Sequence, residues 1–252
     1  MQVNNFGDIL ATGAQRNGTF YVDGTADNFT LNNSGSIDAT GGSGSGLSVQ
    51  VGSFDGDIQS GIILNSGSIV GSGDSGLDAG IRLFTSTNGA EFSGDIFNDV
   101  GGFISADGSP AVLVEEDVLF DGAFVNAGQI DGSVSLASGD FELLDSSVLS
   151  LTIDSATDFD TIDVAGDLLL GGTLELSFLD PLAFEVGQTF DLFDFGAVSG
   201  AFDSISTGPL ALDFANLSSD GTVTIAAAAV PEPSSFVVLA MGGLLLLRRR
   251  RK

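Results

Sequence analysis

Histidine, cysteine and tryptophan are absent from this 252-residue chain, and basic residues are almost absent from its first 247 positions. Without cysteine there is no disulfide framework and no thiolate chemistry. Without histidine the usual general base is missing, and neither a Ser-His-Asp nor a Cys-His pair can be built. The only basic residues before the C-terminus are Arg16 and Arg82. The sequence therefore predicts no enzyme, no catalytic residues and no cofactor.

Negative charge dominates the body of the chain. All 34 acidic residues lie at or before Glu232, whereas five of the seven basic residues occupy 248–252. Nucleic-acid binding needs a basic footprint, so it is excluded as a function. The charge indicates a soluble, self-repelling surface, or one that collects divalent cations. The 20 phenylalanines and an apolar fraction of 43% nevertheless predict a folded core rather than disorder.

A glycine-rich segment and two carboxylate pairs bear on calcium and carbohydrate chemistry. Gly41–Leu47 is similar to a Gly-Gly-x-Gly-x-Asp calcium repeat, but Gly46 stands where aspartate is needed. Weak calcium binding at the surface is the only metal chemistry that we expect, with no dedicated ligands. The carboxylate pairs Asp55/Asp57 and Glu115/Glu116 suit glycoside cleavage, although such pairs arise by chance among so many acids.

A repeating unit of about 30 residues organises the first half of the chain. A Gly-x-Ile-type unit, often preceded by asparagine, recurs, and two further short strand signals separate its copies. The isoleucines are Ile9, Ile37, Ile69, Ile104 and Ile130. The second signal occurs at Leu47–Val51, Ile81–Leu83 and Val112–Val114, and the third at Phe54–Ile58, Phe92–Ile96 and Phe120–Phe124. Three short alternating strands per period predict a coil whose rungs stack on one another.

The fold class predicted from this pattern is all-β. We expect a parallel, right-handed β-helix over residues 1–135, resembling the passenger regions of autotransporter-like and adhesin-like surface proteins. An antiparallel β-sandwich is the structural alternative. A β-rich cap over 136–229 should follow, because its strands alternate between glycine turns and an open β-helix end is an exposed sheet edge. Six phenylalanines should fill the cap's core: Phe159, Phe178, Phe190, Phe193, Phe195 and Phe202.

The last 23 residues, 230–252, have a composition of their own. Pro231, Glu232 and Pro233 precede an apolar run of 12 residues, Phe236–Leu247, and then the basic cluster: Arg248, Arg249, Arg250, Arg251 and Lys252. As a helix the run would reach roughly 18 Å, short of the ~30 Å hydrocarbon core that a span of about 20 residues crosses. Flanking arginines can snorkel to the headgroups, and the basic end should stay on the cytoplasmic side.

This tail resembles the PEP-CTERM sorting signal of Gram-negative bacteria that make extracellular polysaccharide. The resemblance implies that a membrane protease-transpeptidase, exosortase, recognises Pro231, Glu232 and Pro233 and cleaves the signal. It also implies insertion of Phe236–Leu247 as a short transmembrane helix and retention of the basic cluster inside the cell. The protein would then be an inner-membrane intermediate before it reaches the cell surface or the extracellular matrix.

The N-terminus, Met1–Asn5, has neither a basic start nor an apolar core, so no signal peptide is visible there. Because an exported protein needs one, and because the repeat opens in mid-pattern, we expect that N-terminal sequence precedes this chain.

The function that we expect is that of a non-enzymatic exported protein that adheres to, or associates with, extracellular polysaccharide. Two alternatives stay open. One is a permanently anchored single-span membrane protein that keeps its tail. The other is a polysaccharide-degrading β-helix enzyme that depends on Arg82.

Overall fold

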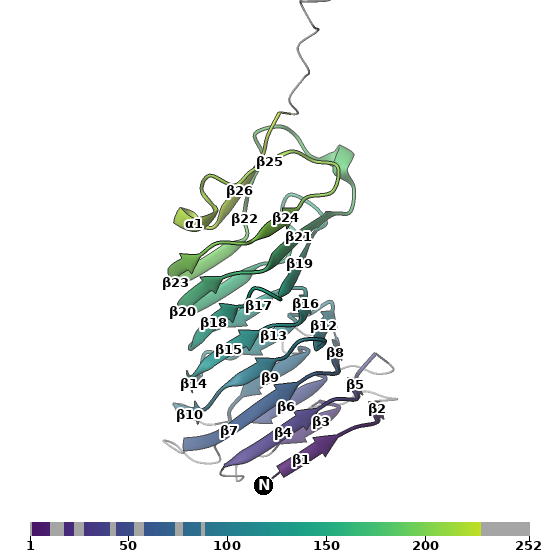
Figure 1. Cartoon of the computed structure of the whole chain (residues 1–252), viewed down its shortest axis with the longest axis vertical. Helices are drawn as coiled ribbons and strands as arrows, with labels where there is room; N and C mark the ends of the chain where they lie inside the picture. The colour runs from purple at the N-terminus through teal and green to yellow at the C-terminus, as the bar shows by residue number, and fades with distance from the viewer. Residues whose placement is uncertain are drawn as a thin grey trace, which may run out of the picture.

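The computed structural model describes residues 2–10, 18–22, 28–40, 44–52, 58–73, 78–86 and 89–227. These residues form an elongated coil of stacked strands, with the N-terminus at one end and a small cap at the other (Figure 1). The sorting residues Pro231, Glu232 and Pro233, the apolar run Phe236–Leu247 and the basic cluster at 248–252 lie outside the described residues.

Two large parallel sheets build the coil in the described part of the chain. The 8-stranded sheet has this order: β2 (Asp8–Leu10), β5 (Ser36–Asp38), β8 (Ser68–Ser72), β12 (Phe103–Asp107), β16 (Gln129–Asp131), β19 (Val148–Ile153), β21 (Thr173–Phe178) and β24 (Ser204–Ser206). Consecutive strands of this order come from consecutive turns of the chain and pair in parallel. This arrangement confirms the predicted parallel β-helix and rules out the antiparallel sandwich.

The 15-stranded sheet forms the remaining walls. Its main path begins with β1 (Gln2–Asn5), β4 (Phe29–Asn33), β7 (Ile58–Asn65), β11 (Ile96–Asn98), β15 (Ala123–Asn126), β18 (Asp140–Leu143) and β20 (Ile162–Leu170). The path returns through β17 (Val134–Leu136), β13 (Val112–Val114), β9 (Ile81–Phe84), β6 (Leu47–Gln50) and β3 (Phe20–Val22). Off this path lie β10 (Ala90–Ser93), β14 (Val118–Asp121) and β23 (Phe193–Gly200). The two arms meet in β20, which is long enough to pair with both β17 and β18.

The repeat register follows the sequence pattern. Ile37 pairs with Ile9 below it and with Ile69 above it, and Ile104 continues the same column to Ile130. Four of these side chains, from Ile37 onward, are completely buried, and each contributes roughly 1.5–3 kcal/mol relative to exposure. The second signal aligns in the same way, with Ile81 between Leu47 and Val112, and Phe92 of the third pairs with Phe120.

A column of buried asparagines runs along one edge of the coil. Asn5, Asn33, Asn65, Asn98 and Asn126 are all at most 8% exposed. Each of the first four donates a hydrogen bond from its Nδ2 to the Oδ1 of the next, at 2.7–2.8 Å. A buried side-chain amide that bonds to the rungs above and below replaces the hydrogen bonds to water that it loses on folding. The asparagines noted before the Gly-x-Ile units are therefore part of the coil's interior.

Glycine is required where the chain turns a corner within the third strand signal of each repeat. Gly94 lies between β10 and β11 with a φ of +151°, and a Cβ there would come within 1.9 Å of the Gly61 carbonyl oxygen. Gly122 meets the Gly94 carbonyl oxygen on the next rung in the same way, at 2.0 Å. Because rungs stack at about 4.8 Å, this corner leaves no room for a side chain.

A small antiparallel sheet closes the C-terminal end of the coil. It consists, in the described residues, of β22 (Thr189–Asp191), β26 (Thr222–Ile225) and β25 (Leu212–Asp213), with the helix α1 (Leu217–Asp220) and the 3-10 helix η1 (Pro181–Ala183) beside it. Phe190, Val223 and Ile225 extend the coil's core into this cap. Of the six phenylalanines predicted for the cap's core, Phe178, Phe190 and Phe193 are buried, and Phe159, Phe195 and Phe202 pack partly buried against them.

The predicted division into 1–135, 136–229 and 230–252 stays a prediction about domains. Parallel pairing nevertheless continues beyond residue 135, through β20 and β21 to β24. The antiparallel cap strands are confined to residues 189–225.

Candidate functional site

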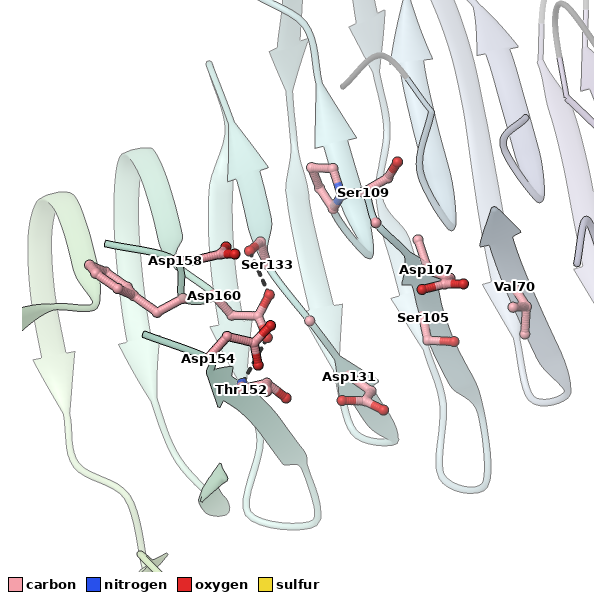
Figure 2. A pocket seen from close by; sticks show the side chains of 15 residues that line it. Val70, Ser105, Asp107, Ser109, Asp131, Ser133, Thr152, Asp154, Asp158 and Asp160 are labelled. Carbon is pink, nitrogen blue, oxygen red and sulfur yellow. Dashed lines mark hydrogen bonds between the residues drawn. The ribbon is translucent and has the colours of Figure 1, made fainter. Parts of the chain in front are cut away.

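An open groove of about 570 Å³ crosses the 8-stranded sheet and is the site best equipped to hold a ligand. Figure 2 shows Asp154, Asp158 and Asp160 gathered beyond the end of β19, with Asp131 and Asp107 on the neighbouring strands. Four hydroxyl side chains share the lining: Ser105, Ser109, Ser133 and Thr152. The groove therefore presents oxygen atoms from several consecutive rungs, and its size is in the range of ligand sites.

One wall of the groove is a tight turn over residues 154–158, which backbone hydrogen bonds hold in place. The amides of Asp154 and Ser155 both donate to the carbonyl oxygen of Asp158, at 3.0 and 2.9 Å. Phe159 follows, and its ring packs edge-on against Phe190 with centroids 5.6 Å apart. This contact fixes the turn to the cap, so the groove has a defined shape.

Asp160 links the turn to the strands beneath it. Its Oδ2 accepts the backbone amide of Thr152 at 2.7 Å, and its Oδ1 accepts the Ser133 hydroxyl at 3.0 Å (Figure 2). The Ser133 Oγ in turn accepts the amide of Thr161 at 3.1 Å. Asp160 is thus a structural acceptor that is already in use.

The other carboxylates of the groove are free to accept hydrogen bonds. Within the described ranges, Asp107, Asp131, Asp154 and Asp158 accept no side-chain hydrogen bond from the protein, and all four are exposed. The closeness of these charges has an electrostatic cost. Partial desolvation raises the pKa of Asp131, and the neighbouring carboxylates of Asp160 and Glu175 raise it further. A ligand that donates hydrogen bonds or carries positive charge would relieve this repulsion.

Arg82, the residue on which the enzymatic alternative depends, lies on a different wall. It belongs to β9 of the 15-stranded sheet, where its Nε donates to the Glu115 carboxylate at 2.7 Å and its guanidinium covers the Phe84 ring at 4.3 Å. Among the described residues, no basic side chain lines the groove beside β19. Of the carboxylate pairs considered from the sequence, Asp55/Asp57 lies outside the described residues, and Glu115 is engaged with Arg82.

A second groove, of about 560 Å³, lies on Arg82's wall and includes Leu113, Glu115 and Asp163. Desolvation raises the pKa of Asp163, and the carboxylate of Asp194 on the adjacent strand adds to the shift. This groove offers fewer hydroxyls than the first and includes a carboxylate that is already paired. Asp163 is therefore a useful control position, since its charge environment resembles that of Asp131 on another wall.

Sequence reasoning did not find the oxygen-rich groove. Asp158 and Asp160 lack the spacing of a calcium-binding loop, so no motif singles them out in the sequence. The signal that could have indicated a site is the acidic connection 154–161 between β19 and β20, which is longer than the connections that follow β12 and β16. Asp107 and Asp131 could not be joined to it, because only the stacking of β12, β16 and β19 brings them together.

Two further findings concern metals and membranes. Across the described residues, no group of three or more acidic side chains is arranged to hold a metal ion. None of the helices in that part of the chain has the length and apolar character needed to cross a bilayer.

The fold is that of a parallel β-helix with a capped C-terminal end. Residues 229–252 match the model of the PEP-CTERM protein-sorting motif. No curated protein and no solved structure matches the chain. The motif marks an exported protein that exosortase, a membrane protein, processes and sorts to the cell surface.

Proposed function

We propose that this protein is a non-enzymatic component of the cell surface or extracellular matrix that binds a neutral polysaccharide along the 8-stranded sheet. The observation that carries the proposal is the groove's set of free carboxylates interleaved with hydroxyls. Sugar hydroxyls are donors, and hydrogen bonds to a charged acceptor are stronger than those between neutral groups. Asp107 and Asp131 lie on adjacent strands, so a polymer running along the coil would meet a new rung about every 4.8 Å.

Charge supports a neutral polymer over an acidic one. The described residues that line the groove include five aspartates and neither lysine nor arginine. A uronic-acid chain would add like charges at short range, and the described residues offer no arrangement of three acids that could bridge to it through a metal ion. A neutral polysaccharide avoids this repulsion, and every free carboxylate can accept a hydrogen bond from its hydroxyl groups.

The test is affinity electrophoresis of the full chain in gels that contain a soluble neutral glucan or, separately, a polyuronate. We expect the neutral glucan to retard the protein. Asp131→Ala combined with Asp107→Ala should weaken its binding about a hundredfold, because each removes an acceptor worth on the order of 1.5 kcal/mol and about 1.4 kcal/mol is tenfold in affinity. In the part of the chain that the structure describes, neither carboxylate has a hydrogen-bond or ion-pair partner, so the variant should fold.

Asp163→Ala is the matched control, since it removes an exposed carboxylate from the other wall and should leave retardation unchanged. Equal retardation of all variants, or retardation by the polyuronate alone, would contradict the proposal. If the wild-type protein released reducing ends from the polysaccharide and the Arg82→Ala variant did not, the alternative of a degrading enzyme would be favoured instead.

We propose further that the sorting tail is removed after export, in contrast to a permanent anchor. The mass of the C-terminal peptide of the mature protein, purified from its own cells, decides between them. We expect the peptide to end near Pro231–Pro233, with the basic cluster lost, and Glu232→Ala to leave the uncleaved form in the membrane. An intact end at Lys252 on membrane-bound wild-type protein would establish the anchored alternative.

A further inference from the structure

The cap carries an apolar loop, Leu179–Val186, whose aliphatic side chains face solvent. Leu182 is 95% exposed, Leu179 is 75% exposed and Val186 is 65% exposed. Single exposed aliphatic residues are common on protein surfaces, but three within one short loop form a local apolar tip.

The loop is held firmly in this position. Phe184 turns inward, and its ring packs edge-on against Phe178 at 5.3 Å and Phe190 at 5.6 Å. The Asp180 carboxylate accepts the amide of Leu182 at 3.2 Å and so caps η1. Because the aromatic ring anchors the loop from within, Leu182 is presented outward by a fixed backbone.

The loop also lies where the described chain ends. The amide of Gly187 donates to the carbonyl oxygen of Ile225 at 2.8 Å, and the amide of Ile225 donates to the carbonyl oxygen of Gln188 at 2.8 Å. Ile225 is the last residue of β26, and the cap forms the end of the molecule opposite the N-terminus (Figure 1). The sorting motif begins at residue 229, which four residues of chain place at most about 14 Å away.

We propose that this loop is a membrane-contact surface that rests in the bilayer interface while the tail holds the protein at the membrane. The apolar run begins at Phe236, so a tether of at most about 40 Å separates it from Ile225. A tether of that length gives the loop a high effective concentration at the bilayer, where weak apolar contacts suffice. The cap end then faces the lipid and the groove-bearing coil extends away from it.

A lipid surface fits this loop better than a folded partner. Leu182 is almost wholly exposed, and aliphatic side chains can enter a fluid interface that needs no complementary pocket. Asp180 and Glu185 flank the tip, so a zwitterionic surface suits it better than an anionic one.

The test uses the absence of cysteine in the natural sequence. Val186→Cys and Leu182→Cys, each labelled with an environment-sensitive fluorophore, are prepared in the full chain and reconstituted through its own tail into vesicles of zwitterionic lipid. We expect emission from both positions to shift to shorter wavelength and to be lost when brominated lipid is included.

Val100→Cys is the matched control. Val100 is 67% exposed, close to the value for Val186, but it lies before β12, four strand spacings from β24 and therefore roughly 19 Å along the coil. Its probe should stay in water. The membrane contact is overturned if the protein does not float with the vesicles. It is also overturned if the probes at 182 and 186 emit at the same wavelength as the water-exposed control probe. A blue shift already present without vesicles would overturn it in favour of cover by the protein's own tail.

Discussion

Asn65→Ala should lower the free energy of unfolding by about 3 kcal/mol. The substitution removes the central member of the asparagine column, which accepts from Asn33 at 2.7 Å and donates to Asn98 at 2.8 Å. It leaves one N–H of the Asn33 amide and the Oδ1 of Asn98 without their partner in a site from which water is excluded, and each such group costs about 1–3 kcal/mol. Urea unfolding followed by circular dichroism measures the loss.

Asn32→Ala is the control for this prediction. Asn32 precedes Asn33 on β4, and its Nδ2 donates to the Oδ1 of Asn4 at 2.7 Å, but at the surface of the coil. Water can replace that bond, so we expect a loss of less than about 1 kcal/mol. Equal losses from the two variants would show that the buried column does not contribute more than an exposed pair. Both should be followed with two probes, because a stacked coil can unfold segment by segment.

Phe92→Ala should be the other strongly destabilising change, with a loss of about 3–5 kcal/mol. Phe92 is completely buried, and its ring lies between those of Phe29 and Phe120, with centroids 6.0 and 5.8 Å away. Removing it opens a cavity between two rungs whose backbone is fixed by parallel pairing on both sides, so the walls cannot collapse to fill it.

Phe6→Ala removes the same atoms from a side chain that is 79% exposed, and it should be nearly neutral. If the midpoint of thermal unfolding fell equally in both variants, the buried ring of Phe92 would not stabilise the fold more than the exposed ring of Phe6. A large fall in the midpoint for Phe92→Ala alone would show that the stacked rings of Phe29, Phe92 and Phe120 are, like the asparagine column, a main source of stability.

The groove, the sorting tail and the apolar loop suggest one arrangement. The described chain ends in the cap, and the loop lies beside that end. The groove lies on the wall of the coil that the 8-stranded sheet forms. Under our proposals, exosortase first acts on a protein that stands on the bilayer by its cap. The released coil then presents its oxygen-rich wall to polysaccharide.

The sequence by itself determined the coil and the tail. The spacing of Ile9, Ile37, Ile69, Ile104 and Ile130 is visible without a structure because each rung must place an aliphatic side chain at the same inward position. The glycines after Phe92 and Phe120 are visible for a similar reason, since stacked corners exclude a Cβ. The sorting tail is local by nature, because its order of prolines, apolar run and cations needs no partner elsewhere in the chain.

Only the tertiary structure decided the rest, because the remaining features join residues from different turns. Asn98 belongs to the asparagine column although it lies six residues before Ile104, where Asn33 and Asn65 lie four before theirs; an added pair of residues hides it from the pattern. The groove depends on Asp107, Asp131 and Asp154 meeting across three rungs. The sequence determined which residues face inward, since that follows from alternation along each strand. Which outward residues become neighbours depends on how many residues each loop inserts between rungs, and only the stacked coil shows that.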